Sequence, residues 1–129
     1  MLEKIILQHI AIVSLGGAIG ATLRFAVGQL LDSTDFPWST FIVNVLGSVL
    51  LGAITVYAIN RGSSEELMLF FSTGLLGAFT TMSTFSVETM KLIKTDEHFT
   101  ALAYIMLTFS VCIIGAFLGW ELGERLENI

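Results

Sequence analysis

Near the middle of the chain the sequence reads Ser72-Thr73-Gly74-Leu75-Leu76-Gly77-Ala78-Phe79-Thr80-Thr81-Met82-Ser83-Thr84-Phe85-Ser86. Seven of these fifteen residues carry a hydroxyl group and two are glycines, although the stretch lies inside an uncharged run of 21 residues, Leu67–Val87. A run of that length can cross a hydrocarbon core of about 30 Å as a helix. The hydroxyls and glycines therefore lie at membrane depth, where they favour a spanning helix that is broken near its middle.

The residues alone leave two interpretations of this stretch open. A break frees backbone groups that protein, water or an ion must satisfy in the membrane, and discontinuous helices use such carbonyls to bind cations. In that interpretation a carbonyl oxygen of Gly77 or Thr80 holds a cation. In the other, the hydroxyls bond to their own helix backbone and form only a packing seam.

Three further uncharged runs surround this one, with 19, 25 and 23 residues: Ile5–Leu23, Phe36–Asn60 and His98–Trp120. Only 13% of the 129 residues are charged, whereas soluble domains average about 25%. The pattern predicts an all-α membrane protein with a single four-helix transmembrane domain over residues 1–129. The four helices are expected at about 4–31, 38–60, 66–94 and 99–123, and the turn-forming segment Asp32–Pro37 joins the first two.

Several classes of protein are excluded by what the sequence lacks. A net charge of −5 provides no basic surface for nucleic acid. The single cysteine, Cys112, has no partner for a disulfide within the chain, and it is expected to be an inert buried thiol. The sequence has no cluster of metal-ligating side chains, no phosphate-binding loop and no pairing of a nucleophile with a base. We therefore predict that the protein is not an enzyme.

The positive charges do not fix an orientation in the membrane. Four helices place both termini on one side, and each side then carries three Lys or Arg residues: Lys4, Arg61 and Arg125 against Arg24, Lys91 and Lys94. The positive-inside rule makes no prediction for such a balance. Either the balance is fortuitous in a short chain, or copies insert in both directions and pair antiparallel.

Small residues recur at four-residue spacing in three of the helices. The ridges are Gly16 with Gly20, Ser48 with Gly52, and the series Gly115, Gly119 and Gly123. Such faces allow helices to approach closely in lipid. They are compatible with packing between copies in an oligomer or with packing inside one subunit.

Polar groups inside the runs are few, so each one matters. Asn44 is a lone amide that either donates to an anion or joins helices, because an unsatisfied amide in lipid is costly. Tyr104, Thr108 and Cys112 share one helical face at four-residue spacing, as a polar track or as simple packing. Arg24 and Glu88 lie near helix ends, where long side chains extend to the interface, and Glu88 can pair with Lys91.

Three motifs together resemble the Fluc/CrcB family of fluoride channels. They are Gly16–Phe25, Thr40–Ser48 and Gly74–Glu88, which cover three of the four helices in order. The resemblance implies an antiparallel, dual-topology homodimer with two fluoride pores, in the prokaryotic plasma (inner) membrane. It also implies a structural sodium ion that is not transported, held on the two-fold axis by the backbone carbonyls of Gly77 and Thr80 from both subunits.

The resemblance also implies roles for side chains along the pore. Asn44 is expected to contact fluoride, and Phe85 to offer the positive edge of its ring to the anion. The other positions that match pore residues are Thr40, Ser83 and Thr84 on the pore side, and Tyr104 and Thr108 on the polar track. One position departs from the family, since Met82 stands where the pattern has a phenylalanine, and a thioether has no ring edge.

The function implied is passive, selective export of fluoride, which limits its toxicity without a pumped cofactor. The alternative is a proton-coupled small multidrug exporter, which shares four helices and dual topology. Such an exporter needs a carboxylate within the membrane to exchange protons for drug. The first run, Ile5–Leu23, contains no acidic residue, and this counts against the alternative.

Overall fold

The computed structural model is all-helical and describes residues 1–31 and 34–128. Residues 32 and 33 of the predicted first link lie outside this range. The first two spans are α1 (Leu2–Leu30) and α2 (Trp38–Arg61), and the last is α6 (His98–Glu127). The third span is divided into α3 (Glu65–Met68), the π-helix η1 (Leu69–Leu76), α4 (Gly77–Phe79) and α5 (Met82–Lys94). The described residues contain four helical spans that are long and apolar enough to cross a membrane, as predicted.

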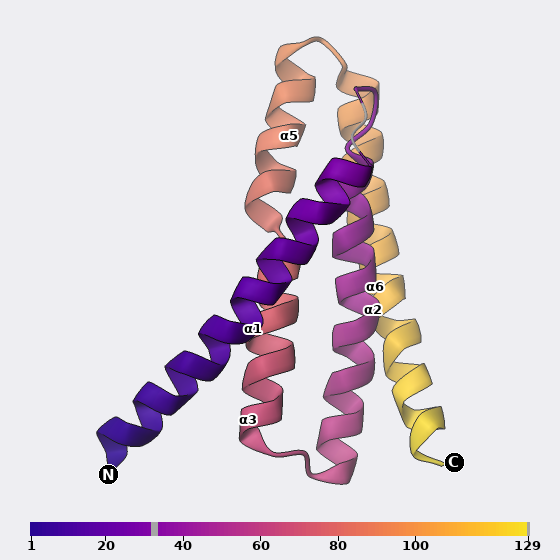
Figure 1. Cartoon of the computed structure of the whole chain (residues 1–129). Helices are drawn as coiled ribbons and strands as arrows, with labels where there is room; N and C mark the ends of the chain where they lie inside the picture. Colours follow the sequence, from indigo (N-terminus) through magenta and orange to yellow (C-terminus); the bar gives the residue numbers. More distant parts are fainter. Residues whose placement is uncertain (32–33, 129) are drawn as a thin grey trace.

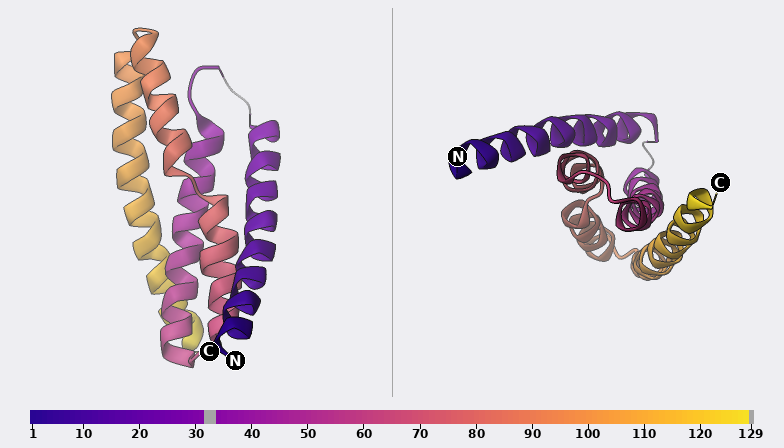
Figure 2. Two further views of the ribbon diagram at one scale, coloured as in Figure 1. Left: turned by 90° about the vertical axis from the view of Figure 1, so that its left-hand side faces the viewer. Right: turned by 90° about the horizontal axis from the view of Figure 1, so that it is seen from below.

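The spans run alternately up and down, so both termini lie at the same end of the bundle (Figure 1). Helix α2 packs mainly against α6, and α1 packs mainly against η1 and α4. Helix α1 crosses the bundle obliquely, and its N-terminal end lies apart from the other helices (Figure 2). Two helix pairs, α1 with the lower part of the third span and α2 with α6, therefore build most of the fold.

Glycines make both close pairings possible. A Cβ atom added at Gly20 would meet the backbone carbonyl of Leu75, and one at Gly119 would meet the carbonyl of Val49. The other predicted ridge positions Gly16, Gly52 and Gly123 likewise face the backbone of a neighbouring helix. Much of each ridge is therefore used for packing inside one subunit, and the ridges no longer indicate an oligomer.

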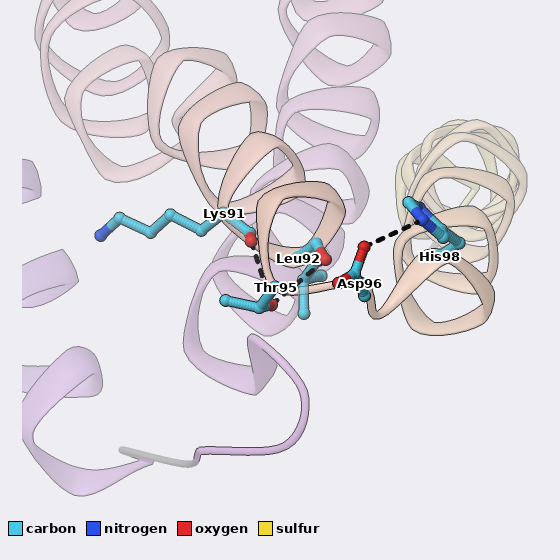
Figure 3. Close-up of polar contacts among 5 residues, drawn as sticks. All are labelled: Lys91, Leu92, Thr95, Asp96 and His98. Carbon is cyan, nitrogen blue, oxygen red and sulfur yellow. Dashed lines mark hydrogen bonds and ion pairs between the residues drawn. The ribbon is translucent and has the colours of Figure 1, made fainter.

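The turn between α5 and α6 depends on Asp96, whose φ is +62° (Figure 3). The Thr95 hydroxyl donates to the carbonyls of Lys91 and Leu92 at 3.1 and 3.2 Å, and both carbonyls also accept from backbone amides, of Thr95 and Glu97, at the end of α5. The Asp96 carboxylate lies 3.6 Å from the ring of His98 in the first turn of α6. Aspartate tolerates this left-handed conformation better than most residues, so the chain reverses here without a glycine.

Little of the apolar surface is enclosed. The buried hydrophobic residues form two small clusters, one around Phe85, Leu92, Ala101 and Tyr104 and one around Val43, Leu76 and Phe79. Most large apolar side chains point outward, such as Ile113 with 68% of its surface exposed. A chain with this distribution needs lipid or another apolar surface around it.

Candidate functional site at the break in the third span

The third span is interrupted at Thr80 and Thr81, as the hydroxyl-rich stretch predicts. Thr80 has φ −84° and ψ 157°, and Thr81 has φ −153° and ψ 116°, so both residues are extended. The Thr81 hydroxyl accepts a hydrogen bond from the amide of Thr84 at 3.2 Å and so caps α5. Seen along the bundle, α5 is displaced sideways from the half of the span that precedes it (Figure 2).

Asn44, on α2, holds the break from the side. Its Nδ2 donates to the carbonyl of Thr81 at 3.1 Å, and its Oδ1 accepts from the Thr81 amide at 2.8 Å. The side chain thereby replaces both helical partners that Thr81 has lost. A primary amide has two N–H donors, and the contacts of the described residues occupy one of them. The structural interpretation of Asn44 is therefore correct, and one donor still remains for another partner.

Arg24, on α1, binds the other side of the break. Its Nε donates to the carbonyl of Ala78 at 3.1 Å, and the side chain is half-buried. The expectation that Arg24 extends to the membrane interface is thus wrong. The physical reason is that Ala78 lies at the C-terminal end of a short helix, where carbonyls lack partners and attract a cation.

Two carbonyl groups at the break remain without a backbone partner. Within residues 1–31 and 34–128, no backbone amide donates a hydrogen bond to the carbonyl of Gly77 or of Thr80. The amide of Thr81, which would reach Gly77 in a continuous helix, is bound to Asn44 instead. The same residues contain no group of three His, Cys, Asp or Glu side chains that could hold a metal ion. A cation at this point would therefore have to use carbonyl oxygens.

A cavity of about 270 Å³ opens beside the break, between α2, α5 and α6. Its lining brings together four of the predicted pore residues: Asn44, Met82, Phe85 and Thr108. Thr108 is 7% exposed, and its hydroxyl has no partner among the described residues. Since buried hydroxyls nearly always have a partner, Thr108 is an exception among the described residues.

A second cavity, of about 170 Å³, lies on the other side of Thr81. It is lined by Thr40 and Thr84, two further predicted pore residues, together with Arg24 and Glu88. Thr81 lines both cavities, whereas Thr80 lines only the first, so Thr81 lies between them.

Glu88 occupies a position that sequence reasoning missed. Its two carboxylate oxygens accept hydrogen bonds from the hydroxyls of Thr40 at 2.9 Å and Tyr104 at 2.8 Å. The predicted ion pair with Lys91 is absent from the described residues, and the carboxylate is bound instead by side chains of α2 and α6. Its partners lie 48 and 16 residues away in sequence on α2 and α6, and no local pattern signals such contacts.

The remaining predicted pore residues lie close to the cavities without lining them. Tyr104 has no exposed surface and packs against the ring of Phe85, with 4.9 Å between the ring centroids. The hydroxyl of Ser83 lies 3.2 Å from that of Thr81, at the exposed start of α5. The structure therefore gathers six of the eight predicted side chains around two cavities and places two behind or beside them.

Comparison of the sequence with known proteins identifies the family of this chain. The sequence model of the CrcB-like protein, Camphor Resistance (CrcB) family matches residues 11–120. The chain belongs to the CrcB family. The match covers α2, the whole of the broken third span and most of α1 and α6, so it includes every residue of both cavities.

Named relatives of this CrcB chain are fluoride channels. It is 39% identical to the fluoride-specific ion channel FluC of Thermus thermophilus, over 93% of this chain and 98% of the relative. It is 41% identical to FluC 2 of Bacillus licheniformis, over 90% of this chain and 87% of the relative. It is 36% identical to FluC of Helicobacter pylori strain Shi470, over 90% of this chain and 93% of the relative. The predicted family is confirmed, and these names are those of ion channels and not of enzymes. Four apolar spans in a bacterial family make the chain a multi-pass prokaryotic membrane protein.

Proposed function

We propose that this CrcB chain is a fluoride-selective channel that lets fluoride leave the cell passively, down its electrochemical gradient. The relatives are named as fluoride-specific ion channels, which supports fluoride as the conducted ion. The observation that carries the proposal is the first cavity, whose lining includes Phe85, Asn44 with one N–H to spare, and Thr108 with a hydroxyl that has no partner among the described residues. All of its described lining residues are uncharged.

Neutral donors suit conduction of a small anion. An ion that crosses must exchange its water shell for groups that bind it well enough to admit it but weakly enough to release it. In the proposed path the Asn44 amide and the Thr108 hydroxyl donate to fluoride, and the ring of Phe85 presents its positive edge. Met82, 61% exposed, lines the same cavity as a flexible thioether in place of a second ring.

We assign the second cavity to the continuation of this path. Thr40 and Thr84 supply hydroxyls there, and Arg24 and Glu88 contribute one positive and one negative side chain to the lining. Tyr104 acts indirectly, because its hydroxyl holds the Glu88 carboxylate and its ring supports Phe85. Ser83 supports the path in the same way, through its contact with Thr81 at the start of α5.

The proposed assembly is an antiparallel homodimer of dual topology. One copy leaves the first cavity open along its side, next to outward-facing apolar residues such as Phe109 and Ile113. A second copy would close that side and turn an open cavity into a pore. Three Lys and Arg residues lie toward one end of the bundle and two toward the other, with Arg24 at the break, and this near balance agrees with insertion in both directions.

The residues at the break fit a structural sodium ion, with the carbonyls of Gly77 and Thr80 as its ligands. Both carbonyls lack a backbone donor in the described part of the chain, and carbonyl oxygens of unwound helices are suitable ligands for sodium. When bound, the ion would supply positive charge to these oxygens and to their counterparts in a second copy. Arg24 and Asn44 hold the neighbouring backbone groups, so the two carbonyls stay free to bind it.

The alternative, a proton-coupled multidrug exporter, finds no support. The relatives carry channel names, and α1 has no acidic residue between Ile5 and Leu23. Glu88 is held by two hydroxyls on α2 and α6, so it is not poised to exchange a proton for a cationic drug in a common chamber.

The proposed function predicts fluoride efflux from liposomes that contain only the purified protein and lipid. Vesicles loaded with potassium fluoride and treated with a potassium ionophore should release fluoride rapidly, as measured with a fluoride electrode. Vesicles loaded with chloride should release it far more slowly, since the cavity provides only a few neutral donors at close range. Equal rates for the two anions, or no fluoride release, would contradict the proposal.

The proposed sodium site predicts that sodium stabilises the assembled protein. The midpoint of thermal unfolding in detergent should be higher in sodium than in an equal concentration of N-methylglucamine, and the dimer should dissociate less on dilution. Binding to the folded form alone contributes about 2.7 kcal/mol when the ion is at a hundred times its dissociation constant. Identical midpoints and identical dimer fractions in the two salts would remove the ion from the proposal.

A further inference from the structure

Glu88 lies where two cavities meet. The second cavity, of about 170 Å³, has Ser39, Thr40 and Glu88 on its wall. A third cavity, of about 150 Å³, is lined by residues of the link between α1 and α2, such as Asp35 and Phe36, together with Ser39 and Glu88. Because Ser39 and Glu88 line both cavities, Glu88 lies between the proposed fluoride path and the end of the bundle that carries this link.

The Glu88 carboxylate uses the only proton of the Thr40 hydroxyl. The Thr40 hydroxyl donates to Oε1 of Glu88 at 2.9 Å, and the Tyr104 hydroxyl donates to Oε2 at 2.8 Å. A hydroxyl has one O–H donor, and an ionised carboxylate can only accept. While Glu88 is ionised, Thr40 can therefore offer only lone pairs to an anion in the second cavity, and lone pairs do not bind an anion.

Thr84, on the wall of the same cavity, is in the opposite state. Its hydroxyl oxygen accepts from the Thr81 hydroxyl at 3.0 Å, and its own proton has no acceptor among the described residues. Thr84 can donate to fluoride as it stands, whereas the proton of Thr40 is held by Glu88. The two hydroxyls that we assign to the second cavity are therefore not equivalent donors.

We propose that Glu88 is a positioning residue whose own protonation decides whether Thr40 donates to fluoride; this inference rests on the proposed function. A proton taken from water adds to Oε1, the carboxyl group then donates to the Thr40 oxygen, and the Thr40 proton turns to the anion. Tyr104 has no exposed surface, so its hydroxyl continues to donate to Oε2. Only O–H bonds form and break in this step, and the proton stays on Glu88 while fluoride passes.

Other ionisable groups near Glu88 come from several elements. Arg24 of α1 lines the second cavity with it, Asp35 of the link lines the third, and Tyr104 of α6 is bound to it. On α5 itself Lys91 lies three residues further along, and the described residues show no ion pair between the two. Helix α2 faces Glu88 with uncharged residues. Asp35 is a second carboxylate, so a pH response has to be assigned to one of the two acids.

The test measures fluoride current through the full-length protein in a planar lipid bilayer, at a series of fluoride concentrations. Undissociated hydrofluoric acid is neutral and adds no current, so the current reports the channel at every pH. As the pH falls from about 8 to about 4, across the range in which carboxyl groups titrate, the half-saturating fluoride concentration of the parent should fall. Asp35→Asn should show the same fall.

Glu88→Gln imitates the protonated acid, because its amide nitrogen can donate to Thr40 while its oxygen accepts from Tyr104. Its half-saturating fluoride concentration should be independent of pH. At about pH 8 it should lie about fivefold below that of the parent, which corresponds to roughly 1 kcal/mol, or about one hydrogen bond. A residue that only clamps α5 to its neighbours would give no such gain. The matched control is Glu66→Gln, which removes an exposed carboxylate in the first turn of α3, outside the three cavities, and should behave as the parent.

Thr40→Val tests whether Glu88 acts through the Thr40 hydroxyl. On this background Glu88→Gln should bring no gain, whereas a charge that acted directly on fluoride would bring the same gain on both backgrounds. The inference is overturned if that gain persists, if Glu88→Gln matches the parent, or if the pH response disappears in Asp35→Asn. A parent without any pH response would also overturn it, even if Glu88→Gln failed to fold. Absence of fluoride current in the parent at every pH would instead contradict the proposed function.

Discussion

Replacing Asn44 by alanine is expected to stop fluoride efflux and to destabilise the protein. The substitution removes both hydrogen bonds to Thr81, at 3.1 and 2.8 Å, and leaves an amide and a carbonyl of the break without partners. Each unsatisfied buried group costs about 1–3 kcal/mol. The change also removes the spare N–H that we assign to fluoride, so efflux from liposomes should fall to the rate of protein-free vesicles.

A second substitution at this position separates the two roles. Asn44→Asp keeps an oxygen that can accept from the Thr81 amide but removes the donor and adds a negative charge to the cavity wall. We expect its thermal midpoint to stay closer to the parent than that of Asn44→Ala, while its efflux falls at least about tenfold through like-charge repulsion. Ser86→Ala is the control, because within the described residues its hydroxyl donates to the Met82 carbonyl of its own helix and to nothing else. Unchanged efflux in Asn44→Asp would show that the amide serves packing alone.

Replacing Gly20 by alanine is expected to separate α1 from the lower half of the third span. The added Cβ would meet the backbone carbonyl of Leu75, which cannot rotate away as a side chain can. Overpacking of this kind typically costs about 1–3 kcal/mol. Because the added Cβ would meet backbone atoms, we expect the cost at Gly20 to lie at the upper end of that range. The displacement would also withdraw Arg24, one turn further along α1, from the carbonyl of Ala78. The thermal midpoint should fall markedly, and efflux should fall with it.

Gly28 offers a matched control on the same helix. A Cβ at Gly28 would meet nothing within 4 Å, so Gly28→Ala should leave the midpoint unchanged or raise it through helix propensity, by up to about 1 kcal/mol. The thermal unfolding midpoints of the two variants can be compared by following intrinsic fluorescence. If Gly20→Ala and Gly28→Ala unfold at the same temperature, the close approach of α1 to Leu75 does not contribute to stability.

Hydropathy and local backbone preference were enough to predict the four spans and the break. An uncharged run of about 20 residues has few alternatives to a membrane-spanning helix. Adjacent threonines after two glycines weaken the helix at one place, and the structure interrupts the span there, at Thr80 and Thr81. The three motifs that resemble the Fluc/CrcB family lie entirely within the region that the family comparison matches.

The partners of the polar groups could not be predicted in the same way. Arg24 and Glu88 were expected to point toward the interface because each lies near the end of an apolar run. The structure instead turns Arg24 to Ala78, 54 residues away, and Glu88 to Thr40 and Tyr104. At membrane depth, a buried donor or acceptor finds its partner wherever the packing of helices brings one close, and hydropathy carries no information on that packing.

The residues of this chain therefore specify what can be read locally: four spans, the place where the third one breaks, and the chemical types available for a pore. The tertiary structure decides which groups meet. It places Asn44 and Arg24 on two sides of the break, frees the carbonyls of Gly77 and Thr80, and divides six of the eight predicted pore residues between two cavities. The reason is physical, since periodicity and turn preference act over a few residues, whereas these contacts depend on how separate helices pack.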